Sequence, residues 1–115
     1  MNARLTRQAA LSACPVKTPP VRAETRNEKL YVTIEYQRPR WQRWLGADER
    51  CRREYGLDAY GREVYDACDG RASVHDIIRV FGKRHGISPA ESEKAVTMFV
   101  KTLMSRGLIG IAISE

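Results

Sequence analysis

The sequence has no apolar run that approaches the roughly 20 residues needed to span a bilayer. It also has little cysteine: Cys14, Cys51 and Cys68 are the only three, and no two of them form a C-x-x-C pair. An odd, scattered set argues against a disulfide framework, a zinc ribbon or an iron–sulfur cluster, and it is typical of a reducing cytosol. We therefore expect a cytoplasmic protein that holds no metal and no cofactor.

Histidine is scarce as well, since only His75 and His85 occur. They fall at the expected start and end of one helix, and neither shares an obvious face with a cysteine, serine or acidic partner. His85 is placed to interact with the C-terminal end of a helix dipole, which is a structural role. The pattern predicts neither a catalytic triad nor a metal site, so we expect a binding protein and not an enzyme.

The chain has the length and composition of one folded domain, with 115 residues, 43% hydrophobic and 30% charged. Residues 11–14 resemble the cleavage box of a bacterial lipoprotein. Arg4 and Arg7, however, interrupt the continuous apolar stretch that such a signal needs. Residues 1–20 are therefore expected to be a flexible N-terminal extension, and residues 21–115 the domain.

Strand signals come first along the domain. Leu30–Tyr36 alternates apolar and polar residues with the period of a half-buried strand. Val21–Thr25 precedes it across a polar turn, which predicts a hairpin, and Arg52–Leu57 is expected to form a third, short strand. Between the second and third strands, Arg38–Arg50 is basic with two tryptophans interleaved.

Three helices are expected to follow, each with its own start and stop signals. The starts are the N-cap residues Asp58, Ser73 and Ser88, and the stops are the glycines Gly70, Gly86 and Gly107. The tail Leu108–Ile113 is apolar enough for a closing strand or wing. The order predicts an α+β fold of the winged helix-turn-helix type, with an N-terminal three-stranded antiparallel sheet followed by three helices.

Several short motifs in this helical half occur in an order and spacing that resemble one family. They are Leu57-Asp58-Ala59-Tyr60-Gly61, Val64-Tyr65, Cys68-Asp69-Gly70, Ser73-Val74 and Arg106-Gly107-Leu108-Ile109. Over roughly residues 21–109 the chain resembles the PqqD family of peptide-recognition domains. It departs from the family pattern at Tyr65, where a tryptophan is frequent, and in a longer insertion at Pro39–Arg50.

The resemblance implies a peptide-binding adaptor. Such a domain binds the leader of a ribosomally synthesised precursor peptide and presents it to a separate modifying enzyme, often a radical-SAM enzyme. The leader would add as a strand to the edge of the third strand, at Arg52, Arg53, Glu54, Tyr55, Gly56 and Leu57. Free backbone groups on an edge strand accept a further strand. Proline at Tyr55 is therefore expected to remove one ladder donor and to weaken peptide binding more than folding.

The same resemblance implies that the bound leader packs against the third helix, Pro89–Arg106. This helix carries more apolar surface than one core needs. Its Met98 edge is flanked by lysines that suit an acidic leader, so we favour it over the Met104 edge. The helix residues expected to contact the peptide are Lys94, Ala95, Met98, Lys101 and Thr102.

The alternative is a winged helix that binds nucleic acid. The net charge of +6 favours it, as does the basic stretch that carries Trp41 and Trp44. Most of that charge lies in the first half, because residues 1–50 hold 10 Lys and Arg against 5 acids and residues 51–115 hold 10 against 9. A nearly neutral third helix is poorly suited to phosphate contacts, so peptide binding is the favoured interpretation. Nucleic acid and membrane are not expected as partners.

Overall fold

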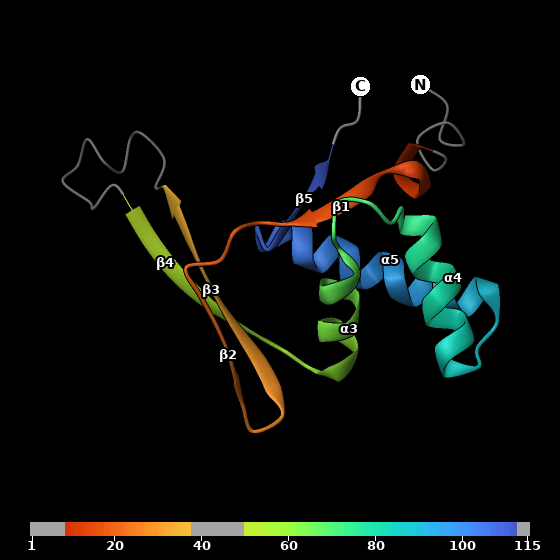
Figure 1. Ribbon diagram of the computed structural model, residues 1–115, viewed down its shortest axis with the longest axis horizontal. Coiled ribbons are helices and arrows are strands. Elements are labelled where there is room, and N and C mark those ends of the chain that lie inside the picture. Colours follow the sequence, from red (N-terminus) through yellow and green to blue (C-terminus); the bar gives the residue numbers. More distant parts are fainter. Residues whose placement is uncertain (1–8, 38–49, 113–115) are drawn as a thin grey trace.

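The computed structural model describes residues 9–37 and 50–112, and it shows an α+β fold (Figure 1). Trp41, Trp44 and the rest of the basic insertion up to residue 49 lie outside the described residues. In chain order the elements are β1 (Cys14–Lys17), β2 (Arg22–Arg26), β3 (Lys29–Gln37), β4 (Arg50–Leu57), α3 (Ala59–Ala67), α4 (Val74–His85), α5 (Pro89–Ser105) and β5 (Ile109–Ala112). Within these residues no helix is both long and apolar enough to cross a membrane.

The expected three-stranded antiparallel sheet is present, with the strand order β2-β3-β4. β2 and β3 are joined by the two-residue turn Asn27-Glu28, whose φ angles are 50° and 68°. Two successive positive φ values belong to the turn type whose twist matches that of the flanking strands. On the face of β3 that meets the helices, Leu30, Val32 and Ile34 are buried. We call this the inner face of the sheet, and the opposite one the outer face.

The helix termini follow the expected capping residues except at the end of α3, which stops at Ala67 with Cys68 as its C-cap, before the predicted Gly70. The Ser73 hydroxyl accepts from the N–H of Asp76, and the Asp76 carboxylate accepts from the N–H of Ser73, so the acidic capping box of α4 is confirmed. At the end of α5, Gly107 has a φ of 74° and the N–H of Leu108 donates to the C=O of Leu103 at 2.9 Å. This is the predicted Schellman termination, which also turns the chain into β5.

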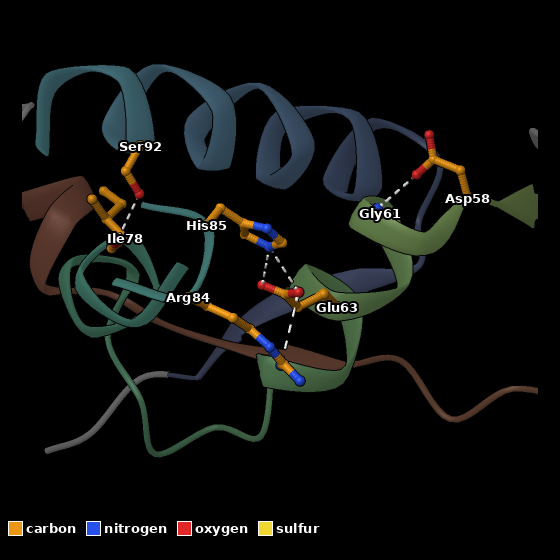
Figure 2. A network of polar contacts seen from close by, with 7 residues as sticks. All are labelled: Asp58, Gly61, Glu63, Ile78, Arg84, His85 and Ser92. Carbon is orange, nitrogen blue, oxygen red and sulfur yellow. Dashed lines mark hydrogen bonds and ion pairs between the residues drawn. The ribbon is translucent and has the colours of Figure 1, made fainter. Parts of the chain in front are cut away.

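The core lies where α3, α4 and α5 meet the inner face of the sheet, and Leu103, Leu108, Val32, Val64 and Val96 are fully buried there. α4 and α5 approach each other closely at Gly82 and Ser92. A Cβ on Gly82 would lie 3.2 Å from the Ser92 side chain. The buried Ser92 hydroxyl donates to the C=O of Ile78 at 2.5 Å, so its burial leaves no unpaired donor (Figure 2).

Residues 9–20 differ from the expected flexible extension. Cys14–Lys17 forms β1, which pairs antiparallel with β5 near both ends of the chain (Figure 1). The other side of β1 is bonded to the α3–α4 loop: the N–H of Gly70 donates to the C=O of Pro15, and the N–H of Lys17 to the C=O of Cys68. A four-residue strand with one buried residue, Pro15, is too short for its pattern to register as a strand in the sequence.

Candidate functional site

β4 is an edge strand of the three-stranded sheet, since within the described residues it is bonded to β3 alone. The register decides which of its backbone groups face the open edge. Arg26 and Lys29 flank the two-residue turn and form a hydrogen-bonded pair, so the backbone groups of Lys29 and of every second residue after it point to β2. In agreement, the N–H of Val21 donates to the C=O of Thr33 at 2.9 Å. The intervening residues, such as Val32, point their backbone groups to β4.

Val32 is paired with Tyr55, and the alternation continues along β4. Tyr55 therefore exchanges its N–H and C=O with β3, whereas Arg52, Glu54 and Gly56 turn theirs to the open edge. This register corrects the expectation for proline at Tyr55. That substitution would break the ladder to β3, and the position that tests the open edge is Glu54.

The side chains of β4 divide between the two faces of the sheet. Glu54 lies on the outer face, where its Oε1 is 2.7 Å from Nη2 of Arg26. Arg26 in turn lies over the ring of Tyr31, with 4.2 Å between the guanidinium carbon and the ring centroid. Gly56 lets that ring approach, because a Cβ on Gly56 would be 3.0 Å from Cε1 of Tyr31. The outer face is thus a charged, internally paired surface.

An open hollow of about 330 Å³ lies between the C-terminal end of β4 and α5. The strand side contributes Lys29, Gly56 and Leu57, and the helix side contributes Met98, Phe99, Thr102 and Arg106. The Met98 side chain is 58% exposed, so this edge of α5 offers an apolar surface beside the strand. An edge strand and an apolar helix face therefore meet at one place.

The predicted site residues are partly brought together. Gly56, Leu57, Met98 and Thr102 line the hollow, and Lys94 and Lys101 line a second, adjoining hollow that shares Met98. Ala95 is half-buried against the core. Arg52 and Arg53 are exposed farther along β4, and Tyr55 is half-buried on the inner face.

Six residues that line the hollow were not among the predicted site residues: Lys29, Asp58, Gly61, Phe99, Leu103 and Arg106. Arg106 was expected only as part of a helix end. Arg106 is anchored beside β4, because its guanidinium carbon lies 5.3 Å from the centroid of the Tyr55 ring. A contact between residues of different elements leaves no spacing signal in the sequence.

His85 has an acidic partner that the sequence did not predict. Its Nε2 lies 3.0 Å from Oε1 of Glu63 on α3, and Nη1 of Arg84 is 3.8 Å from the same oxygen (Figure 2). The rings of Tyr60 and Phe81 pack against the imidazole at 5.2 and 4.4 Å between centroids. The cluster joins α3 to α4 and holds no nucleophile. Among the residues that the structure describes, no group of three or more His, Cys, Asp or Glu could hold a metal ion.

Three of the shifted pKa values belong to groups around the α3–α4 loop, away from the hollow. Burial raises the pKa of the Cys68 thiol to about 11. The backbone N–H groups of Ala72 and Arg71 lower the pKa of Asp69 by donating to its carboxylate. Such donors also lower the pKa of Asp76, through the N–H of Ser73. All three groups organise the α3–α4 segment, so none of them marks a reaction centre beside β4.

An open sheet edge beside a hollowed helix face defines a small α+β module suited to binding an extended chain. A family model described as Coenzyme PQQ synthesis protein D (PqqD) matches residues 47–109, which is more than half of the chain. The chain therefore belongs to the PqqD family, as its motifs predicted, and the match spans β4, α3, α4 and α5. No curated protein and no solved structure matches it.

Proposed function

We propose that the chain is a cytoplasmic peptide-binding adaptor. It takes the leader of a ribosomally synthesised precursor peptide as an added strand on β4 and presents it to a separate modifying enzyme of the radical-SAM type. The observation that carries this proposal is the open edge of β4 directly beside the hollow at α5. Membership of the PqqD family supports it.

The edge of β4 supplies the affinity that is independent of sequence. Arg52, Glu54 and Gly56 turn three N–H donors and three C=O acceptors outward. Each ladder bond contributes about 0.5–1.5 kcal/mol net, because water already satisfies these groups in the free protein. Several such bonds fix the peptide's register without choosing its sequence.

The hollow supplies the selectivity. Side chains of an added strand alternate between the two faces, so every second peptide residue faces the inner side, where Leu57, Met98 and Phe99 lie. Burying one large apolar side chain there contributes about 1.5–3 kcal/mol. A flexible methionine accommodates different side-chain shapes, which suits a surface that binds an extended peptide.

The adaptor performs no chemistry in this proposal, and the modifying enzyme supplies the reactive centre. Presentation requires that the leader be held while the remainder of the precursor stays free. A strand added at β4 meets this need, because it is held along one edge by backbone bonds and by one row of side chains.

The test compares Glu54→Pro with Glu54→Ala. Both remove the carboxylate that pairs with Arg26, but only proline removes an N–H that faces the open edge. Synthetic leaders of short open reading frames beside the gene are titrated by calorimetry. We expect a leader to bind the wild-type chain with a Kd below about 100 μM. Glu54→Pro should weaken this affinity at least about tenfold, and Glu54→Ala less than about threefold.

Two results would contradict the proposal. Equal binding by the proline and alanine variants would place the peptide away from the β4 edge. Failure of every leader to bind, together with tight, salt-sensitive binding of single-stranded DNA, would favour the nucleic-acid alternative.

A further inference from the structure

Most basic side chains on the faces away from the hollow are neutralised by a carboxylate. Lys17 pairs with Asp66 at 3.0 Å, Arg26 with Glu54 at 2.7 Å, and Arg84 with Glu63 at 3.8 Å. Arg22, Arg62 and Arg79 have acidic partners as well. Most basic side chains of β2, α3 and α4 thus have a carboxylate partner nearby, with Lys83 of α4 as an exception among the described residues.

The hollow at α5 differs. Lys29 and Arg106 line it, and Lys94 and Lys101 line the adjoining hollow. Within residues 9–37 and 50–112, none of these four cations has a carboxylate within ion-pair distance. Two acids lie near these cations. Asp58 is already used as the N-cap of α3, where its Oδ1 accepts from the N–H of Gly61 at 2.7 Å (Figure 2), and Glu93 lines the adjoining hollow.

Arg106 is also held in place. Its guanidinium lies over the Tyr55 ring. Its backbone is fixed as the C-cap of α5, where its N–H donates to the C=O groups of Thr102 and Met104. A guanidinium that lies over an aromatic ring can still donate its N–H groups to a ligand at its edge. Because the ring already restricts its motion, it loses less conformational entropy on binding a carboxylate than a free side chain would. Cations that have no ion pair among the described residues, around an apolar floor of Met98 and Phe99, suit a ligand with both an acidic and an apolar group.

We infer that the bound leader carries an acidic residue and a large apolar residue separated by one position. The acid meets Lys29 and Arg106, and the apolar side chain covers Met98 and Phe99. The spacing follows because residues i and i+2 of a strand share a face and lie about 6.6 Å apart. This inference rests on the proposed function, since it assigns the side chains of a strand bound at β4.

A peptide fits these features better than a nucleic acid does. Phosphate contacts alone would need cations and no apolar floor, and a base-stacking platform would need exposed aromatic rings. Here Met98 is the exposed residue of the floor, and the neighbouring β4 edge offers backbone groups for a strand.

In the test, a library of random short peptides displayed on phage is panned against the purified chain. The same library is panned against the double variant Lys29→Gln with Arg106→Gln. The matched control is Arg71→Gln with Lys83→Gln, which removes the same charge from two exposed residues that have no ion pair among the described residues and line neither hollow. Because the whole chain is basic, this control separates local recognition from general attraction.

We expect peptides enriched on the wild-type chain and on the control to carry Asp or Glu two positions from a large apolar residue. On Lys29→Gln with Arg106→Gln, the acidic preference should disappear while apolar enrichment remains. Enrichment without any acidic preference would overturn this inference and leave the proposed function standing. Enrichment of no peptide at all would overturn the proposed function and this inference with it.

A selected peptide then measures the contact directly. Replacing its acid by the matching amide should weaken binding to the wild-type chain by about tenfold, as expected for a carboxylate shared by two exposed cations. The same replacement should change binding to Lys29→Gln with Arg106→Gln by less than about twofold, because the partners are already absent. An equal loss in both proteins would show that other residues bind the acid.

Discussion

β1 and β4 are both strands with one neighbouring strand. They differ in whether their second edge is hydrogen-bonded to another part of the chain. β1 pairs with β5, and its other edge is closed by the α3–α4 loop, where the N–H of Gly70 donates to the C=O of Pro15 and the C=O of Cys68 accepts from the N–H of Lys17. β4 pairs with β3, and among the described residues no strand or loop closes its other edge.

The difference separates a structural strand from a binding strand. Backbone polar groups need partners, so a protein either closes an edge or leaves it to water and to ligands. β1 contributes the buried Pro15 to the interior. In the part of the chain that the structure describes, β4 instead leaves the backbone groups of Arg52, Glu54 and Gly56 open, beside the apolar hollow and its cations.

Removing β1 should have the largest effect on stability. Deletion of residues 1–17 takes away the partner of β5 and the acceptors of the Gly70 and Val74 N–H groups. We expect a loss of at least about 3 kcal/mol in the free energy of unfolding, measured with urea. Deletion of residues 1–8, which leaves β1 in place, is the control. A loss below about 1 kcal/mol for the longer deletion would mean that β1 is as dispensable as the sequence suggested.

Proline scanning along β4 should separate its closed edge from its open edge. Tyr55→Pro removes an N–H bonded to β3 and should lower the free energy of unfolding by about 2–3 kcal/mol. Glu54→Pro removes an outward N–H and should cost less than about 1 kcal/mol, since edge strands tolerate proline at such positions. Urea unfolding of both variants checks the register, and the reverse order of stabilities would contradict it.

The helical half of this structure was largely predictable, because its signals are local. The N-caps Asp58, Ser73 and Ser88 accept from backbone N–H groups of the first turn. Gly86 and Gly107 adopt the left-handed conformation that helix ends require. Each of these signals lies within a few residues of the structure that it determines.

The features that sequence reasoning missed depend on contacts across long separations. His85 meets Glu63 from 22 residues away, and Lys17 meets Asp66 from 49. The hollow joins Lys29 of the hairpin to Arg106 at the end of α5, and no periodicity links those positions. The edge position of Arg52–Leu57 was inferred from the family resemblance, whereas the outward direction of its backbone groups required the register.

The closed edge should also be sensitive to alkaline pH. The C=O of Cys68 accepts from Lys17 of β1, and burial raises the pKa of its thiol to about 11. The unfolded thiol ionises near its ordinary value of about 8.5, so the stabilisation is complete below that pH and is lost as the pH rises towards 11. We expect a decline of about 2–3 kcal/mol between pH 8 and 11 that Cys68→Ala lacks. Parallel alkaline slopes in the two proteins would contradict this prediction.

The smallest expected effect is the acid sensitivity of the loop that closes β1. Backbone N–H groups of Ala72 and Arg71 hold the pKa of Asp69 below its ordinary value, so the native carboxylate stays ionised at pH values where the unfolded one is protonated. Its stabilisation is therefore complete above the ordinary pKa and is lost as the pH falls through the native pKa. Asp69→Asn should flatten the acid side of a plot of melting temperature against pH, whereas Glu28→Gln, in the β2–β3 turn, should leave it unchanged. If β4 is the binding edge, neither substitution changes leader affinity at neutral pH, because both lie outside the hollow and its rim.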